Sequence, residues 1–326
     1  MFASDADIRE SSKGGFTITT HPRTIKRVLY CKRRWIQRQP TEILAEEFSI
    51  VRPTVQIYSV RPFDDPSEEV FVLRRAKKHV GCLGLIDGDE IHINTTLQEP
   101  VIQIDQLPYI ISECDEFLAV YKPHGLPTTP QGKFMNCNLH SQLERVYKTS
   151  FLQPINRLDR CTGGVVVFAK SPAVFANRNV LRKLYIAKVG VNAKNFRISS
   201  TINLPLTVQK HVPNQTLMTI VDHKQGKESM TKLSRAFGNG FLRCEPVTGR
   251  THQLRVHLAA TGAPIEGDLL YDRVTDEISS QPEQISLFAW RYEIELSGMI
   301  HIFSVSRERL PSWLSSAPDA LFDLGS

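Results

Sequence analysis

The sequence predicts an α+β protein whose larger part, residues 108–326, contains a mixed, largely antiparallel central sheet flanked by helices and loops. Two observations carry this prediction. Strand-like segments outnumber helix-like segments after residue 108, and the two kinds do not alternate one for one. A doubly wound parallel sheet requires such alternation and is therefore disfavoured. The chain also shows no internal repeat and no low-complexity tract.

The elements of this part follow from local patterns. The strand-like segments are residues 117–122, 164–170, 184–189, 217–222, 241–247, 286–296 and 300–305. Helical patterns occupy residues 138–148, 171–182 and 252–261. Ser171 followed by Pro172 is typical of a helix start. Thr251 is expected to cap the third helix, and Gly262 stands where that helix should end.

Composition and charge place few limits on function. A chain of 326 residues with 41% hydrophobic content can bury one large core or form two domains. Charged residues make up 23%, as in ordinary soluble globular proteins. The net charge is +6, with a pI near 9.0. A basic balance favours a polyanionic partner, because each neutralised phosphate releases counterions, but many basic proteins bind no nucleic acid.

Cysteine usage and the first residues bear on the compartment. The six cysteines are scattered without a CxxC pair or a zinc-binding spacing, which indicates reduced thiols. No apolar run is long enough to span a membrane, so no membrane association is expected. Acidic residues among the first ten argue against a secretory signal or a usual transit peptide. We expect a cytoplasmic or nuclear protein, and mitochondria remain open because the basic amino-terminal third suits them.

The amino-terminal third divides into two expected units. Residues 1–22 are polar and are expected to be mobile, whereas residues 23–107 are expected to form a small basic module that contacts RNA. No acidic residue occurs between positions 11 and 41, and within residues 23–38 Tyr30 and Trp35 stand among seven cations. This block is either a solvated basic arm or an RNA-facing arm whose aromatic rings stack on bases.

The same module contains a predicted helix–turn–strand unit. A helix is expected over residues 65–79, because Asp65 can cap it and Pro66 fits its first position. A turn at 87–89 and a strand at 91–93 should follow. The unit is similar to a degenerate S4-like RNA-binding unit, although capping and helix-dipole effects alone would also explain its charges.

Asp159 is the main candidate for chemistry. It lies between Arg157 and Arg160, just before the apolar run 165–169. Arg255 lies on the apolar face of the helix predicted at 252–261, where an unpaired charge would be costly. Asp159 is a candidate partner for Arg255, and a plain ion pair remains an alternative to a catalytic role.

Two further features admit a structural and a functional interpretation. Tyr185 lies in a predicted strand, where it is either a core tyrosine or an aromatic surface on which a planar ring stacks. The segment Lys-Pro-His-Gly-Leu-Pro at 122–127 is a stiff loop after a strand. Such a loop either helps to build a site or is only a good turn.

Together, these segments resemble the RluA-type family of pseudouridine synthases. The resemblance rests on 156-NRLDRCTGG-164, the loop 122–127, Lys183 with Tyr185 and Ala187, the stretch 249-GRTHQLRVHL-258, and the pairs Pro264-Ile265 and Gly267-Asp268. Four motifs, the last of them followed by these pairs, stand in the family's order between residues 122 and 268. The segments 29–48, 88–101 and 131–144 additionally look like eukaryotic relatives that modify uridine 32 in the tRNA anticodon loop.

The resemblance implies a pseudouridine synthase fold and the isomerisation of uridine to pseudouridine in RNA, with no cofactor and no metal. tRNA is the expected partner, at position 32 of the anticodon loop. Ribosomal or organellar RNA is the alternative substrate, and a catalytically inactive RNA-binding relative is the alternative function. The resemblance also implies a monomer without an obligate protein partner.

The resemblance assigns roles to individual residues. Asp159 is implied as the catalytic carboxylate, acting as a nucleophile or as a base near the ribose, and its neighbouring arginines favour its ionised form. Arg157 would enter the gap that the flipped base leaves, Tyr185 would pack on that base, and Arg255 would pair with Asp159. The remaining substrate-binding residues implied by the motif are Thr251, His252 and Gln253.

The sequence departs from the family pattern at three positions. Asn156 replaces a histidine, Gly163 replaces a serine, and Phe288 stands where a histidine is common. The segment 95-TTLQEPV-101 also lacks the histidine-rich turn of the eukaryotic relatives. These departures leave Asp159 and Arg255 in place. They bear on the geometry of the loop around Asp159 and on which RNA is the substrate.

Overall fold

A computed structural model of the chain describes most of residues 84–324 and parts of the amino-terminal segment. The described ranges are residues 6–11, 14–20, 23–39, 42–43, 69–74, 77–79, 84–97, 99–131, 134–190, 200–210, 217–234, 240–272 and 284–324. The expected helix start at residues 65–66 lies outside them. Within these ranges, no helix has both the length and the apolar character needed to cross a membrane.

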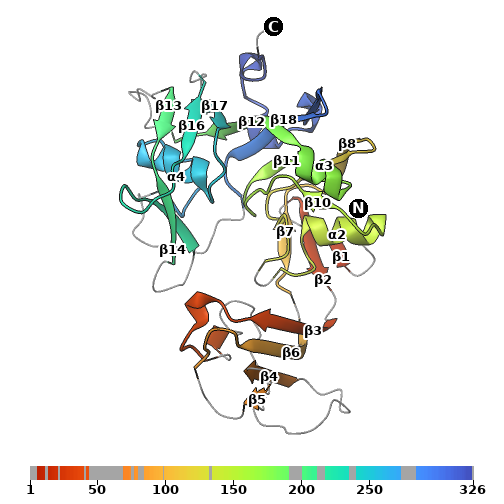
Figure 1. Cartoon of the computed structure of the whole chain (residues 1–326). Coiled ribbons are helices and arrows are strands. Elements are labelled where there is room, and N and C mark those ends of the chain that lie inside the picture. Colours follow the sequence, from red (N-terminus) through yellow and green to blue (C-terminus); the bar gives the residue numbers. More distant parts are fainter. Residues whose placement is uncertain are drawn as a thin grey trace.

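A ten-stranded sheet forms the main domain (Figure 1). Its path runs β13-β16-β17-β12-β18-β11-β9-β8, with β10 paired to β11 and β19 paired to β18. The strands are β8 (Tyr109–Glu113), β9 (Phe117–Lys122), β10 (Gln153–Pro154), β11 (Gly163–Ala169), β12 (Asn179–Lys188), β13 (Thr201–Asn203), β16 (Met230–Leu233), β17 (Phe241–Pro246), β18 (Leu287–Leu296) and β19 (Met299–Ser304). Among the described pairs of this sheet, only β11 with β18 is parallel, which confirms the mixed, largely antiparallel sheet.

The core lies where apolar runs meet in the centre of this sheet. Every residue of β9 and β11 is buried, as expected for continuous apolar runs covered on both faces.

Helices and a two-stranded ribbon flank the sheet. They are α2 (Leu139–Tyr147), α3 (Pro172–Asn177), α4 (Gln253–Ala260), β14 (Leu206–Lys210) and β15 (Leu217–Val221). Short 3-10 turns follow at η4 (Arg307–Arg309), η5 (Ser312–Leu314) and η6 (Asp319–Leu321).

Two sequence-based helix predictions need correction. The helix expected over 171–182 ends at Asn177, and β12 follows because this segment pairs with β18 along its length. Ser171 does cap α3, accepting a hydrogen bond from the Val174 amide at 3.2 Å. Thr251 does not cap α4, since the N-cap is His252, whose backbone is left-handed (φ 53°) and whose side chain makes no capping bond.

The segment 1–22 also differs from expectation. Its described residues form β1 (Ala6–Glu10) and β2 (Phe16–Thr20), which make a three-stranded sheet with β7 (Ile102–Ile104). Ile18 is fully buried and belongs to the main hydrophobic core. The expectation of a mobile leader is therefore wrong for these two strands, which are held by strand pairing and by burial of apolar side chains.

A separate four-stranded sheet lies within the range expected for the basic module (Figure 1). It has the order β3 (Arg23–Tyr30), β6 (Glu90–Leu97), β4 (Glu69–Arg74) and β5 (Lys77–His79), and the turn η1 (Arg33–Trp35) follows β3. The expected turn at 87–89 and strand at 91–93 are confirmed.

The helix predicted over 65–79 is wrong for its described residues, which form the hairpin β4–β5. The sequence 69-EVFVLR-74 is rich in β-branched and aromatic residues, and it pairs with β6. Capping residues mark where a helix could begin, but they do not outweigh a strand-forming interior that finds a partner.

Candidate active site

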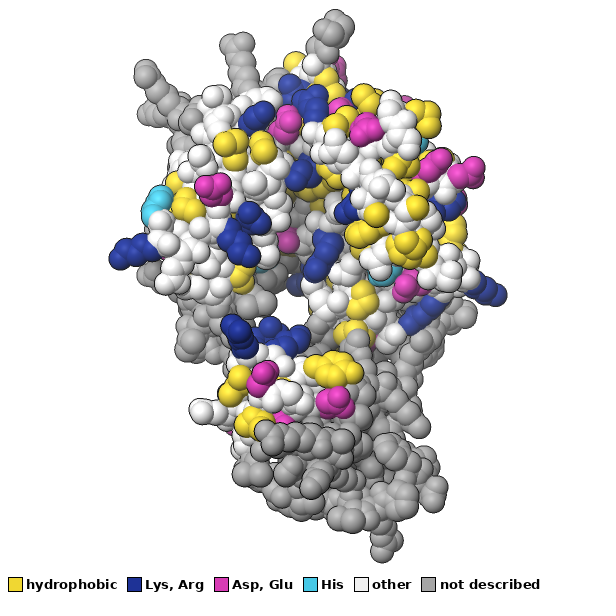
Figure 2. Space-filling view, viewed as in Figure 1, with side chains coloured by type: hydrophobic (Ala, Val, Ile, Leu, Met, Phe, Trp, Pro, Cys, Tyr) yellow, Lys and Arg dark blue, Asp and Glu magenta, His cyan; other side chains and the backbone are white. Residues whose placement is uncertain are grey.

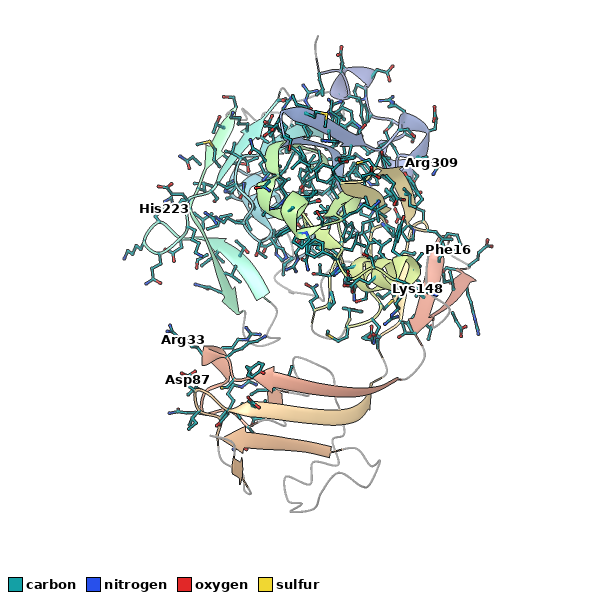
Figure 3. All side chains as sticks on the ribbon, turned by 45° about the vertical axis from the view of Figure 1, so that its right-hand side comes forward. Phe16, Arg33, Asp87, Lys148, His223 and Arg309 are labelled. Carbon is teal, nitrogen blue, oxygen red and sulfur yellow. The ribbon has the colours of Figure 1, made fainter. Side chains whose placement is uncertain are left out.

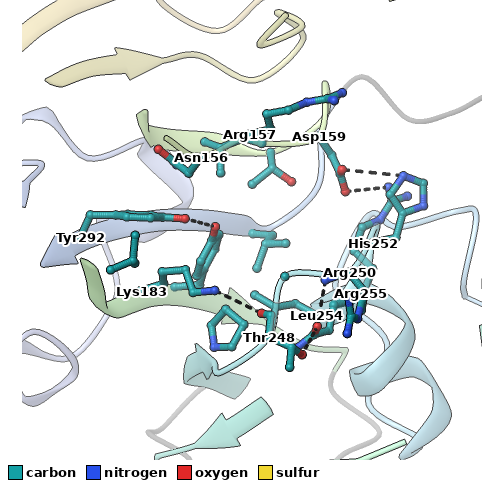
Figure 4. A pocket seen from close by; sticks show the side chains of 18 of the residues that line it. Asn156, Arg157, Asp159, Lys183, Thr248, Arg250, His252, Leu254, Arg255 and Tyr292 are labelled. Carbon is teal, nitrogen blue, oxygen red and sulfur yellow. Dashed lines mark hydrogen bonds and ion pairs between the residues drawn. The ribbon is translucent and has the colours of Figure 1, made fainter. Parts of the chain in front are cut away.

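A pocket of about 420 Å³ opens beside the carboxyl-terminal end of β10 (Figure 4). Its walls come from the loop at 154–162, from β12 and β18, and from the segment at 246–255 that leads into α4. Its volume lies in the range typical of small-molecule sites. Six of the seven sequence-predicted site residues line it: Arg157, Asp159, Tyr185, His252, Gln253 and Arg255. Thr251 is exposed and is not among the lining residues.

Asp159 is held from one side of the pocket by two side chains of the α4 segment (Figure 4). Its Oδ2 accepts a hydrogen bond from Nη1 of Arg255 at 3.3 Å, and its Oδ1 lies 3.7 Å from Nε2 of His252. The Asp159 side chain is 27% exposed, whereas that of Arg255 is fully buried. The pairing of Asp159 with Arg255 that the sequence predicts is therefore confirmed.

Arg255 is itself fixed by a second carboxylate. Asp268 accepts hydrogen bonds from Nε and Nη2 of Arg255 at 2.7 and 2.8 Å, and both side chains are buried. Burial alone would lower the pKa of Arg255, but the hydrogen bonds and the charges of Asp268 and Asp159 outweigh it and raise the pKa above the ordinary value. The two-pronged bond also fixes the plane of the guanidinium that faces Asp159.

The stiff loop at 122–127 forms hydrogen bonds with the segment that contains Asp159. Lys122 is fully buried, and its Nζ donates to the carbonyls of Pro123, Leu126 and Arg160 at 2.9, 2.7 and 3.4 Å. Burial lowers the pKa of Lys122 to about 7. The Gly125 amide also donates to the Arg160 carbonyl at 2.8 Å. The loop therefore helps to build the site and is more than a turn.

Tyr185 stands on β12 with its ring almost fully buried. Its hydroxyl lies 2.9 Å from the hydroxyl of Tyr292 on β18, and the two rings meet edge to face. Burial raises the pKa of Tyr185 well above its ordinary value, so it remains a neutral phenol. Tyr292 lines the pocket and was missed by sequence reasoning, since a tyrosine in an alternating strand looks like an ordinary core residue.

Two other residues of the motif segments reach the pocket without having been predicted. Lys183 donates from Nζ to the Thr248 carbonyl at 3.2 Å, and burial lowers its pKa. Arg250 donates from Nε to the Glu228 carbonyl at 3.1 Å. Both belong to the segments that carry the family resemblance, so the motif itself marks them even though no chemistry singles them out.

Arg157 and Gln253 make different kinds of contact. Arg157 is exposed at the pocket mouth, where its Nη2 donates to Oε1 of Gln131 at 3.2 Å. Gln253 is buried, and both ends of its amide bond protein groups: Oε1 accepts from Thr248 and Nε2 donates to the Met230 carbonyl. This geometry suits a residue that shapes the turn before α4.

The departures from the family pattern have structural explanations. Asn156 donates from Nδ2 to the Val165 carbonyl at 3.0 Å and accepts from the Val167 amide at 2.9 Å, so it ties the aspartate loop to β11. Phe288 is fully buried against Tyr121, outside the residues that line the pocket. Among the described residues, the polar side chains paired with the Asp159 carboxylate within 4 Å are those of Arg255 and His252, so neither Asn156 nor Phe288 bonds it.

Gly163 is explained by its neighbour His124. A Cβ at position 163 would lie 2.6 Å from Cε1 of His124 and 2.7 Å from its Nδ1, closer than real Cβ contacts allow. The imidazole is buried and tethered, with Nδ1 at 3.0 Å from Asp105 and Nε2 at 3.3 Å from the Leu287 carbonyl. His124 thus fills the space that a side chain at position 163 would need.

Gly163→Ser is therefore expected to lower the free energy of unfolding by about 2 kcal/mol through overpacking. In a His124→Ala background the same substitution should cost almost nothing, because the clashing ring is gone. Urea denaturation of the four proteins measures this coupling. Gly190→Ser is the matched control, since nothing lies within 4 Å of a Cβ there. An equal cost of Gly163→Ser in both backgrounds would contradict the steric explanation.

Comparison with known proteins identifies the family of the chain. Residues 116–260 match the profile of the RNA pseudouridylate synthase family. The chain is 36% identical over 178 residues to the dual-specificity RNA pseudouridine synthase RluA of Vibrio vulnificus, covering 50% of this chain and 68% of that protein. It is 29% identical over 256 residues to human pseudouridylate synthase RPUSD2, covering 75% and 44%.

A yeast protein matches a similar share of the chain. The mitochondrial tRNA pseudouridine(32) synthase of Saccharomyces cerevisiae is 27% identical over 264 residues, covering 76% of this chain and 53% of that protein. The chain thus spans about half the length of several curated relatives that it matches. The order of the motifs, the site that they build and the extent of the bacterial match lead to one conclusion: this chain belongs to the RluA-type family of RNA pseudouridine synthases.

Proposed function

We propose that this chain isomerises uridine to pseudouridine in RNA, with Asp159 as its catalytic residue. The supporting observation is the placement of Asp159. Its carboxylate lines a pocket that also contains Tyr185, and a fully buried arginine holds one of its oxygens at 3.3 Å. A carboxylate in this position can attack a carbon centre or remove a ribose proton.

The pocket supplies the other functions that the reaction needs. A stacked uracil must leave the RNA to reach Asp159, which costs a few kcal/mol, less in a loop than in a duplex. The buried Tyr185 offers the flipped base an aromatic surface. Arg157 is exposed at the mouth. In our proposal it enters the vacated gap, because its planar guanidinium can both stack and donate hydrogen bonds.

Our proposed substrate is tRNA, at uridine 32 of the anticodon loop. The support is the similarity to the yeast enzyme whose name carries that position, together with the resemblance of segments 29–48 and 131–144 to such relatives. Ribosomal RNA is the second candidate, because the chain is also 29% identical over 223 residues to the ribosomal large subunit pseudouridine synthase C of Rickettsia conorii. We keep the cytoplasm or nucleus as the expected compartment, with mitochondria as the alternative, since the yeast relative is named as mitochondrial.

We further propose that the module at residues 23–107 contacts the RNA alongside the main domain at 108–326. Tyr30 is 69% exposed next to exposed Lys32, Arg33 and Arg34, a combination that suits stacking on bases and pairing with phosphates. Figure 3 shows Arg33 on the side of the small sheet that is turned toward the main domain. In Figure 2, cationic side chains border the hollow of this face from both parts.

Mapping pseudouridine in total RNA from cells with and without this protein tests the proposal. Loss of pseudouridine at tRNA position 32 would support the tRNA assignment, because an isomerase acting there leaves uridine when it is absent. Loss at a ribosomal site instead would move the same chemistry to the second candidate. An unchanged map in every RNA, together with no product from purified protein on those RNAs, would overturn the enzymatic proposal.

A further inference from the structure

The two oxygens of Asp159 face two side chains, Arg255 on α4 and His252 at its N-cap. Both of these side chains are contacted by residues of the segment 268–271. Asp268 fixes Arg255, and Tyr271, three residues later, contacts His252. The Tyr271 hydroxyl lies 2.7 Å from Nδ1 of His252, and its ring lies under the Arg255 guanidinium at 5.0 Å. Tyr271 does not line the pocket, so any influence that it has on the reaction passes through other side chains.

The bonds of the Tyr271 hydroxyl set the direction of its proton. The Thr219 amide donates to this hydroxyl at 2.9 Å, and a backbone amide has no other role than donor. The hydroxyl proton therefore remains available for His252, whose Nδ1 must then be the acceptor. With Nδ1 unprotonated, the neutral ring carries its proton on Nε2, the nitrogen that faces Oδ1 of Asp159 at 3.7 Å.

The opposite tautomer is disfavoured by the same contacts. If Nδ1 carried the proton, the hydroxyl would accept two bonds, and its own proton would lack an acceptor among the described residues. The Nε2 lone pair would also face a carboxylate oxygen, which places two acceptors against each other. Burial lowers the pKa of His252 and raises that of Tyr271 to about 12, so both groups are neutral near pH 7.

We propose that Tyr271 is a positioning residue that fixes His252 in the Nε2–H tautomer, so that His252 and Arg255 together orient the carboxylate of Asp159. The inference rests on the proposed function for its catalytic consequence, but its structural part does not. The left-handed backbone of His252 (φ 53°) belongs to this arrangement, since it turns the ring back toward Asp159 at the start of α4.

The tautomer can be measured without any activity. Long-range ¹H–¹⁵N spectra of the full chain with ¹⁵N-labelled histidine distinguish an Nε2–H ring from an Nδ1–H ring. His252 in the unchanged protein should give the Nε2–H pattern, and Tyr271→Phe should convert it to a mixture. A predominantly Nδ1–H ring in the unchanged protein would overturn the proposal, even if the Tyr271 variant did not fold.

Kinetics on RNA test the consequence for catalysis. Tyr271→Phe keeps the ring beneath Arg255 and removes only the hydroxyl, so kcat should fall about tenfold with little change in KM. Tyr147→Phe is the matched control, because its hydroxyl bonds Glu113 outside the pocket. If the unchanged protein makes no pseudouridine while His252 shows the Nε2–H pattern, the proposed function fails and the positioning proposal survives in its structural part.

A double substitution separates positioning from simple support of the fold. His252→Asn removes the ring but tolerates the left-handed backbone, so it disconnects Tyr271 from Asp159. In that background Tyr271→Phe should change kcat by less than about twofold, because Tyr271 no longer has a side chain to act through. A full tenfold loss in both backgrounds would show that the hydroxyl acts by another route and would overturn the proposal.

Discussion

An Asp159→Asn variant is expected to fold and to bind RNA like the unchanged protein while its rate of pseudouridine formation falls more than about a thousandfold. The amide matches the carboxylate in shape, but it carries no charge and can neither attack carbon nor accept a proton effectively. The fold should tolerate the change because Arg255 keeps its two hydrogen bonds to Asp268. The free energy of unfolding should therefore change by less than about 1 kcal/mol.

Three measurements are needed on this variant: product formation at saturating RNA, RNA affinity and urea denaturation. Asp115→Asn is the matched control, since Asp115 is exposed and lies outside the pocket. Activity within tenfold of the unchanged protein would show that Asp159 is not the catalytic residue. A large loss of both affinity and stability would instead mean that the carboxylate is mainly structural.

Asp268→Asn, in contrast to Asp159→Asn, should cause a large loss of stability. Asp268 and Arg255 are both buried, and their two hydrogen bonds are 2.7 and 2.8 Å long. Removing one partner of a buried ion pair leaves an uncompensated charge, which costs about 3–5 kcal/mol. Asp159 lies farther from Arg255, at 3.3 Å, and is partly exposed to solvent, so it compensates for only part of that loss.

Thermal and urea denaturation measure the effect, and the expected fall in Tm is about 10 °C. Asp159→Asn serves as the comparison, because it removes a carboxylate from the other side of the same guanidinium. If Asp268→Asn lowered the free energy of unfolding by less than about 1 kcal/mol, Asp268 would not be the carboxylate that mainly compensates the buried charge of Arg255. The contrast between the two variants assigns stability to one carboxylate and chemistry to the other.

The central strands could be predicted from the sequence because they depend on local information, and the Asp159–Arg255 pair could be predicted because a buried charge needs a partner. β9 and β11 are continuous apolar runs, and such runs become buried strands in almost any sheet. Arg255 lies on an apolar helix face, which limits its partner to a carboxylate in another buried segment. Asp159, next to such a run, met that requirement. Asp268 met it as well and was not predicted as a partner, although it binds Arg255 more closely, at 2.7 and 2.8 Å against 3.3 Å for Asp159.

The errors in the prediction arose where a distant partner overrides a local pattern. The capping residues before β4 favoured a helix, yet residues 69–74 find strand partners in β6 and β5. The polar character of residues 1–22 suggested mobility, but residues 16–18 of β2 pair with β7, and Ile18 enters the core. Strand pairing of this kind is a property of two segments and is not visible in either one alone.

The sequence by itself determined the family, the catalytic candidate and the positions of the main strands along the chain, because these depend on motifs and on runs of adjacent residues. Only the tertiary structure decided which side chains support them. The hydroxyls of Tyr185 and Tyr292 meet across 107 positions, and the Thr219 amide and Tyr271 meet across 52. Hydrogen bonds require distances near 3 Å, and only the packing of the whole sheet brings such remote groups that close.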